Sequence, residues 1–349
     1  SNVVELKPVQ VDTVKIDCSL PVDCLNEVAV WIKGQIGTAP KYSIVQATLS
    51  FACAMASRCV RLKDGTSSSA FLAIVADSAG QIQPLKGILN SAIDACGDRQ
   101  IIRGTKISGS TCLHKQLLTM PRMFWATDDY ATMINFGKKQ QSGAIQGALS
   151  AINEVYLNNT LYLDKDSIGA NFGKKDGDGD KHISEYNIYR PSLTMLSLMS
   201  YKHIDFVAQR DQYSIGSLQR LMIADGGDSV TCERDFDAPF PTNVKTVVAA
   251  IKNTGSDFFD IASMNPTQKI AVFDCDNTAQ LFTHSLSRIK ATCSSDERKD
   301  LLGIALGWCG SFKRLCVALG AFNNPSSPII NESIVQWCSN WIVFHLEKL

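Results

Sequence analysis

The segment Phe71–Gly97, FLAIVADSAGQIQPLKGILNSAIDACG, decides the fold. Its first six residues, Phe71–Ala76, are all apolar and predict a fully buried strand. After a short stretch of small and polar residues, apolar residues recur at helical spacing. These are Leu85, Ile88, Leu89, Ala92, Ile93 and Cys96. Gly97 ends the pattern, so the segment predicts a strand, a turn and an amphipathic helix.

Strand, turn and helix in this order also form the phosphate-binding loop (P-loop) G-x-x-x-x-G-K-[ST]. Here Gly80 matches the last glycine, but Gln81 replaces the lysine and Ile82 replaces the hydroxyl. The lysine normally contacts the β- and γ-phosphates and the hydroxyl holds Mg²⁺. Lys86 lies about 140° further around the helix and is a poor substitute. The residues alone favour a plain strand–turn–helix. The alternative is that Ala79–Ile82 is a degenerate nucleotide loop.

A second apolar strand, MFWATDDY (Met123–Tyr130), ends in two acids, Asp128 and Asp129. This form is typical of a Walker B segment, in which one carboxylate organises Mg²⁺ and the second orients the attacking water. Asp128 would be the Mg²⁺ ligand. Acids at a solvated strand end are also common, so both interpretations stand at this stage.

Strands alternate with helices along the chain, which predicts an α/β core with a largely parallel sheet and a ligand site at the carboxyl ends of its strands. We expect three segments. Residues 1–62 would hold an extended lead-in and helices, and residues 63–240 the α/β core with a polar insertion at about 164–186. Residues 241–349 would form a mostly helical subdomain. The uncharged stretch Tyr42–Ser57 is short for a membrane span and predicts a buried helix.

Composition excludes several kinds of site. The 34 basic and 34 acidic residues give a net charge of zero, so nucleic-acid binding would need a local basic patch or a ring-shaped assembly. NFGKK at 171–175 is one such patch, although a solvated loop is the plainer interpretation. The 12 cysteines form no C-x-x-C pair, so no zinc is expected. We expect them to be buried thiols in a reducing compartment. Asp176–Glu185 departs from the calcium-loop pattern, so no calcium is expected either.

Three segments in order carry a resemblance: Phe71–Leu89, Gly104–Ile134 and Arg190–Gly227. Together they resemble the ATPase core of phage- and mobile-element-encoded replicative helicase or primase–helicase proteins. The similarity covers about residues 25–230. It extends more weakly into LGWCGSFKRLCVALGAF (Leu306–Phe322), which is similar to the helical lid region of that family.

The resemblance implies a RecA-like or AAA-like P-loop core and assigns roles to single residues. Gly80 and Gln81 fall on the last glycine and the lysine of the loop, and Asp128 and Asp129 on the Walker B pair. Ser197 falls near a polar sensor at the end of the third strand. Arg220 falls on an arginine that would reach the γ-phosphate of a neighbouring subunit. A buried hydroxyl for Ser197 and a solvated cation for Arg220 are the alternatives.

The resemblance also implies a function. The chain would act in DNA replication of a phage or mobile element, in the cytoplasm of a bacterial host. Mg-ATP would be the cofactor, but the lost lysine and hydroxyl should leave hydrolysis weak or absent. Expected partners are single-stranded or forked DNA, replication proteins and further copies of the chain in a homo-oligomer such as a hexamer, without a membrane.

Three alternatives remain at this stage. The chain could be an active ATP-dependent helicase with a non-standard loop. It could be a non-enzymatic adaptor or inhibitor that binds the replication machinery. It could also be an unrelated α/β fold whose motifs match by accident.

Overall fold

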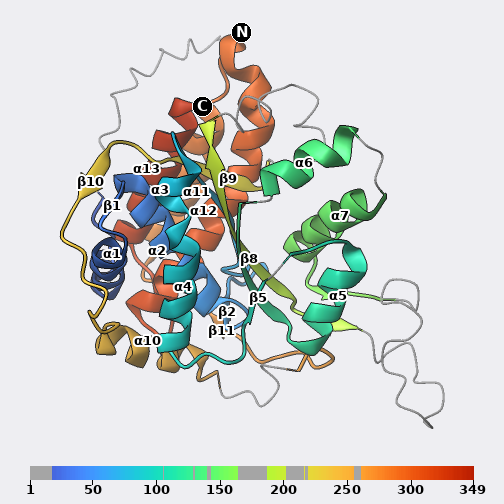
Figure 1. The fold of residues 1–349 in the computed structure, drawn as a ribbon, viewed down its shortest axis with the longest axis horizontal. Coiled ribbons are helices and arrows are strands. Elements are labelled where there is room, and N and C mark those ends of the chain that lie inside the picture. The colour runs from blue at the N-terminus through green and yellow to red at the C-terminus, as the bar shows by residue number, and fades with distance from the viewer. Residues whose placement is uncertain are drawn as a thin grey trace.

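The computed structural model describes residues 18–104, 106–128, 130–139, 143–163, 187–201, 216, 219–254 and 261–349. At its centre lies a five-stranded sheet in the order β4-β5-β8-β3-β9, with every pair parallel (Figure 1). The strands are β3 (Phe71–Ala76), β4 (Ile102–Arg103), β5 (Arg122–Thr127), β8 (Ser192–Ser200) and β9 (Leu221–Asp225). The prediction of a mixed α/β core with a parallel sheet is confirmed.

The registers fix where each strand ends. Ala76, the last residue of β3, lies opposite Ser200, the last residue of β8. Thr127, the last residue of β5, lies opposite Ser197 instead. The strand β5 therefore ends three residues below the level at which β3 and β8 end. Side chains that follow β3 and β5 consequently leave the sheet at different heights.

Helices cover both faces of the sheet (Figure 1). On one face lie α5 (Ser110–Thr119), α6 (Tyr130–Lys139) and α7 (Gly143–Leu157). On the other lie α2 (Lys41–Ala56), α12 (Leu302–Asn323) and α13 (Glu332–Lys348). Around α2 pack α1 (Asp23–Ile36), α4 (Pro84–Ala95) and α10 (Thr242–Lys252). The helix α11 (Asp276–Ala291) packs against α12 and α13. In the chain, the 3₁₀ helix η3 (Asp296–Leu301) connects α11 to α12.

The helix α2 is the centre of the core. Every residue from Tyr42 to Ala56 is buried, as expected for that uncharged stretch. The one amide among them, Gln46, donates hydrogen bonds to the carbonyls of Ala73 (3.3 Å) and Met222 (3.1 Å). Its own oxygen accepts a 3.1 Å bond from the indole of Trp341. This buried polar side chain is thereby satisfied and joins α2, the sheet and α13.

The carboxyl end of α2 is held by a buried ion cluster. Arg122, fully buried, donates to the carbonyls of Ala54 (3.1 Å) and Met55 (3.2 Å) in the last turn of the helix, where carbonyls lack intrahelical i+4 partners. It also forms a 2.9 Å ion pair with the buried carboxylate of Asp98, which Lys252 approaches at 3.1 Å. Burial raises the pKa of Asp98, but the two cations outweigh that effect and hold it below its usual value.

The helix α12 is long and apolar. Within the part of the chain that the structure describes, Arg298–Asn323 is the one helical stretch that could cross a membrane by length and composition. The helix contacts α2, α11, α13 and β9, and the indole of Trp308 donates a 3.0 Å bond to the carbonyl of Leu221. Burial against these elements accounts for its apolar composition.

Short strand pairs tie distant segments together. They are β1 (Thr38–Pro40) with β10 (Ser229–Thr231), β2 (Val60–Arg61) with β11 (Lys269–Ile270), β6 (Thr160–Leu161) with β7 (Ile188–Tyr189), and β12 (Val272–Phe273) with β13 (Ile329–Ile330). One continuous hydrophobic core extends from Leu20 to Leu346. It takes side chains from all three segments expected from the sequence, 1–62, 63–240 and 241–349.

Candidate functional site at the carboxyl edge of the sheet

Parallel strands send the chain out at one edge, where ligands of open α/β sheets bind. Here the chain leaves β3 at Asp77, β5 at Asp128 and β8 at Tyr201, and β9 ends with Asp225. Three carboxylates therefore follow or end strands at this edge. Asp77 and Asp225 follow or end neighbouring strands, whereas Asp128 lies two strands from β3 and about three residues lower.

The turn after β3 is too short to cradle phosphates. Only Asp77 and Ser78 lie between β3 and α3 (Ala79–Ile82). The Ser78 hydroxyl accepts a 3.2 Å bond from the N–H of Gly80, and the Ser78 carbonyl accepts a 3.1 Å bond from the N–H of Gln81. A working loop instead points a run of backbone N–H groups at the ligand.

The side chains at the phosphate-loop positions differ in chemistry from those of a working loop. Ile82, at the hydroxyl position, is fully buried in the hydrophobic core. Gln81, at the lysine position, is exposed and carries no charge. Gly80 belongs to α3 and does not have the positive φ that would require glycine. The residues present at this turn do not fit Mg-ATP.

A side-chain bridge crosses the end of β3. The Tyr201 hydroxyl donates a 2.5 Å bond to Oδ1 of Asp225, and the Lys348 ammonium donates a 3.1 Å bond to Oδ2. The N–H of Gly227 also donates to Oδ1, at 2.9 Å. Burial raises the pKa of Asp225, but the combined effect of these three donors is larger and opposite. The pKa of this carboxyl therefore lies below its usual value. Burial, together with the Asp225 and Asp77 carboxylates, raises the pKa of Tyr201.

The turn after β9 covers the amino end of α2. The N–H groups of Tyr42 and Lys41 donate to the carbonyls of Gly226 (2.9 Å) and Asp228 (3.0 Å), and the N–H of Gly226 donates to Val75 (2.7 Å). A Cβ atom on Gly226 would lie 2.9 Å from the Val75 carbonyl oxygen, so glycine permits this close approach. Free N–H groups at a helix start can bind anions, and here the protein itself occupies two of them.

The Walker B candidates are placed in part. Asp128 is exposed after β5, two strands away from β3 and thus about 10 Å across the sheet. Asp129 lies outside the described residues. Tyr130, which follows them, is buried and packs edge-on against Trp125 at a centroid distance of 6.1 Å. Among the described residues, no three His, Cys, Asp or Glu side chains are grouped so that they could hold a metal ion.

Ser197 lies inside β8, opposite Ala73 and Thr127. Its hydroxyl is buried and has no hydrogen-bond partner in the described part of the chain. The strand continues for three more residues to Ser200, which occupies the strand end. Ser197 therefore does not reach the edge where Asp77 and Asp225 lie.

Arg220 lies at the amino end of β9, on the other side of the sheet from Asp128. Its Nη1 donates to the carbonyl of Gly216 (2.6 Å) and to Oδ1 of Asn153 (3.3 Å). Gly216 has a φ of 71°, and a Cβ there would lie 2.5 Å from the same Nη1. Within one chain, the structure does not bring Arg220 and Asp128 together.

No motif in the sequence indicates the residues that bridge this edge. Tyr201, Asp225 and Lys348 are distant in sequence, and their grouping depends on strand order. The motifs NFGKK at 171–175 and Asp176–Glu185 lie outside the described residues. Comparison of the sequence with models of known protein families and with curated proteins finds no match.

Proposed function

We propose that the chain is a helicase-like replication module of a phage or mobile element, with a RecA-like or AAA-like P-loop core that does not hydrolyse ATP. The order of the sheet carries this proposal. Numbered along the chain, the five strands lie in the order 2-3-4-1-5. The strand that leads to the degenerate loop thus lies between the fourth and fifth strands, as the strand that leads to the phosphate loop does in such cores.

The position of Arg220 supports the same proposal. An arginine at the amino end of β9 is remote from the carboxyl edge of its own sheet. It can act on a nucleotide edge only in a neighbouring copy, as the arginine fingers of ring-forming ATPases do. A homo-oligomer such as a hexamer is accordingly part of the proposal.

The absence of hydrolysis follows from the edge itself. Phosphoryl transfer depends on positioned positive charge and backbone donors around the phosphates. Here the turn has two residues, the lysine is Gln81 and the hydroxyl is a buried Ile82. The loss of one such donor costs on the order of 3 kcal/mol of transition-state stabilisation, so the combined loss should leave no measurable activity.

The proposed role in DNA replication rests on the order of the three segments that resemble the helicase family. Single-stranded or forked DNA and replication proteins are the proposed partners, and the bacterial cytoplasm is the proposed location. Because the net charge is zero, DNA binding would use a local basic surface of the assembled ring.

The test measures phosphate release by the whole chain, with and without single-stranded DNA, beside Asp128→Asn as the matched variant. We expect no DNA-stimulated hydrolysis in either protein. DNA-stimulated hydrolysis that Asp128→Asn abolishes would instead establish an active helicase. In parallel, fluorescence anisotropy should detect DNA binding that weakens with salt. No DNA binding, with a stable complex on a replication protein, would favour the adaptor or inhibitor alternative.

A further inference from the structure

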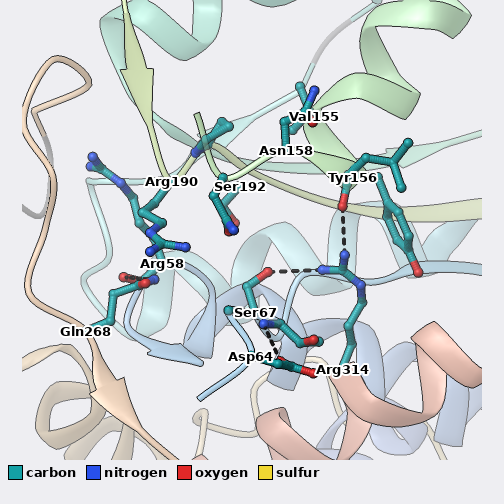
Figure 2. Close-up of a pocket in the computed structure, with 15 residues that line it drawn as sticks. Arg58, Asp64, Ser67, Val155, Tyr156, Asn158, Arg190, Ser192, Gln268 and Arg314 are labelled. Carbon is teal, nitrogen blue, oxygen red and sulfur yellow. Dashed lines mark hydrogen bonds between the residues drawn. The ribbon is translucent and has the colours of Figure 1, made fainter. Parts of the chain in front are cut away.

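A polar cavity of about 150 Å³ lies at the amino edge of the sheet, away from the candidate site (Figure 2). In the same measure, a cavity needs roughly 10–15 Å³ to hold one water molecule. Three arginines line it: Arg58 after α2, Arg190 before β8 and Arg314 from α12. Ser192, the first residue of β8, lies between them in the close-up.

The charge of the lining is unbalanced. Among the described residues that line the cavity, Asp64 is the one carboxylate. Its Oδ2 already accepts a 3.0 Å bond from Lys313. The lining therefore holds three guanidinium groups and one carboxylate, and Lys313 already pairs with that carboxylate. An anion inside the cavity would be attracted, since charges in a partly dry site are poorly screened.

Two of the arginines are held rigidly. Nη2 of Arg58, a residue that is almost fully buried, donates to three backbone carbonyls, those of Tyr189 (3.0 Å), Ile261 (2.9 Å) and Met264 (3.0 Å). These bonds fix the guanidinium of Arg58 against the wall. A preorganised cation of this kind loses little freedom when it binds a ligand.

Arg314 forms the opposite wall. Its Nη1 donates to the Ser67 hydroxyl (3.0 Å) and the Ser69 carbonyl (2.8 Å), and its Nη2 to the Tyr156 carbonyl (2.7 Å). The guanidinium carbon also lies 3.9 Å from the centre of the Tyr156 ring. These donors of Arg314 are therefore used in hydrogen bonds within the chain. The bonds hold the segment before β3 and the end of α7 in place.

Arg190 provides the third guanidinium. Its Nη1 is shielded from solvent and has no hydrogen-bond partner in the described part of the chain. Its φ of 52°, like the φ of 61° at Arg58, lies in the left-handed region, which is uncommon for a residue with a side chain. Burial and the nearby Arg61 lower the pKa of Arg190. A shielded cationic donor without an acceptor is costly, and such a group is often explained by a ligand.

We propose that this cavity is a binding site for a phosphate-type oxyanion, with the guanidinium of Arg190 as its principal ligand. A guanidinium presents parallel N–H donors that match two oxygens of a phosphate. Asn158 and Ser192 line the same space and offer neutral polar groups. By the same measure the cavity has room for several water molecules, so a phosphate group fits inside it.

This site does not depend on the proposed function, because it lies at the opposite edge of the sheet from Asp77. The anion could be free phosphate or the terminal phosphate of a nucleic-acid strand. Both present the same doubly charged oxyanion, so the experiment has to separate them.

Calorimetry with inorganic phosphate at constant ionic strength tests the site in the whole chain. We expect binding by the unmodified protein, a loss of affinity of about tenfold or more in Arg190→Gln, and no change in Lys86→Gln. Lys86 is an exposed lysine on α4, so its removal is a matched loss of charge. No binding by the unmodified protein, or equal binding by Arg190→Gln, would overturn the proposal.

Two further measurements secure the result. If Arg190→Gln does not fold, Arg190→Lys keeps the charge but loses the paired donors, and the same loss of affinity is expected in it. A 5′-phosphorylated oligonucleotide is compared with its 5′-hydroxyl twin. A preference for the phosphorylated strand that Arg190→Gln removes assigns the site to nucleic-acid ends. Phosphate binding without that preference assigns it to the free anion.

Discussion

The Tyr201 hydroxyl and the Asp225 carboxylate form a 2.5 Å hydrogen bond across the end of β3. Tyr201 follows β8 and Asp225 ends β9, and these two strands flank β3 in the sheet. Lys348 brings the end of α13 to the same carboxylate. Side chains of the protein therefore bridge the carboxyl edge of the sheet, where a phosphate-binding loop would lie.

Tyr201→Phe should weaken this closure. The variant removes one donor to a charged acceptor that is partly exposed, so the free energy of unfolding should fall by about 1 kcal/mol. Urea denaturation measures the change. Tyr162→Phe is the control, since Tyr162 is 77% exposed and its variant should lie within about 0.5 kcal/mol of the parent. Equal effects in the two variants would show that the bridge contributes nothing.

Asp98→Asn should be among the most damaging single substitutions of a charged residue. It leaves the fully buried guanidinium of Arg122 without its carboxylate, which costs roughly 3–5 kcal/mol of folding free energy. Asp94→Asn removes the carboxylate of a surface pair with Arg103 and should cost about 1 kcal/mol or less. Chemical denaturation compares the two. A loss in Asp98→Asn no larger than in Asp94→Asn would refute this assignment.

His345 should make stability depend on pH. Its ring is buried against Tyr42 and Trp341, and burial, with help from Lys348, lowers its pKa to about 3, although Asp225 opposes the shift. The unfolded chain binds a proton below about pH 6.5, whereas the folded chain does not. The free energy of unfolding therefore does not depend on His345 protonation above about pH 6.5. Below that pH it falls by about 1.4 kcal/mol per pH unit until the pH nears 3.

Denaturation at pH 7, 6, 5 and 4 tests that slope. His345→Leu should remove this component, so the difference in stability between parent and variant should change steadily as the pH falls. His284→Gln, on the exposed side of α11, should leave the slope unchanged. A parent and a His345→Leu variant with parallel pH profiles would contradict the assignment.

Gly307 should not tolerate a side chain. A Cβ atom there would collide with the backbone carbonyl of Gln219, next to Arg220. Gly307→Ala should therefore lower stability by roughly 1–3 kcal/mol, despite the better helix propensity of alanine. At Gly303, one turn earlier, the Cβ would lie 3.0 Å from the flexible amide end of Gln219, and Gly303→Ala should be close to neutral. Thermal unfolding compares the pair, and a Gly307→Ala protein as stable as Gly303→Ala would contradict the close packing of α12 on Gln219.

Local patterns predicted the main elements well. The apolar run of β3 and the helical spacing of apolar residues in α4 predicted the positions of both elements closely. Each pattern depends only on residues that are neighbours in the sequence. The strand β4 was missed, since it has two residues, Ile102 and Arg103, and no pattern of its own. The degeneracy of the loop was visible in Gln81 and Ile82, but the two-residue turn and the burial of Ile82 were not.

Non-local groupings were beyond sequence reasoning. Gln46 and Trp341 are 295 positions apart, and Tyr201 meets Asp225 only because β8, β3 and β9 are neighbours. Strand order depends on the packing of the whole core, which periodicity does not encode. The arginine-lined cavity likewise takes residues from the turn after α2, from α7 and from α12, which no motif connects.

Calorimetry of Mg-ATP with the whole chain, in the absence and presence of single-stranded DNA, tests the loss of the nucleotide site most directly. We predict no heat of nucleotide binding in either condition, because the β3–α3 turn offers neither a cradle nor a cation. Micromolar Mg-ATP binding that Asp128→Asn weakens would instead establish a working nucleotide site.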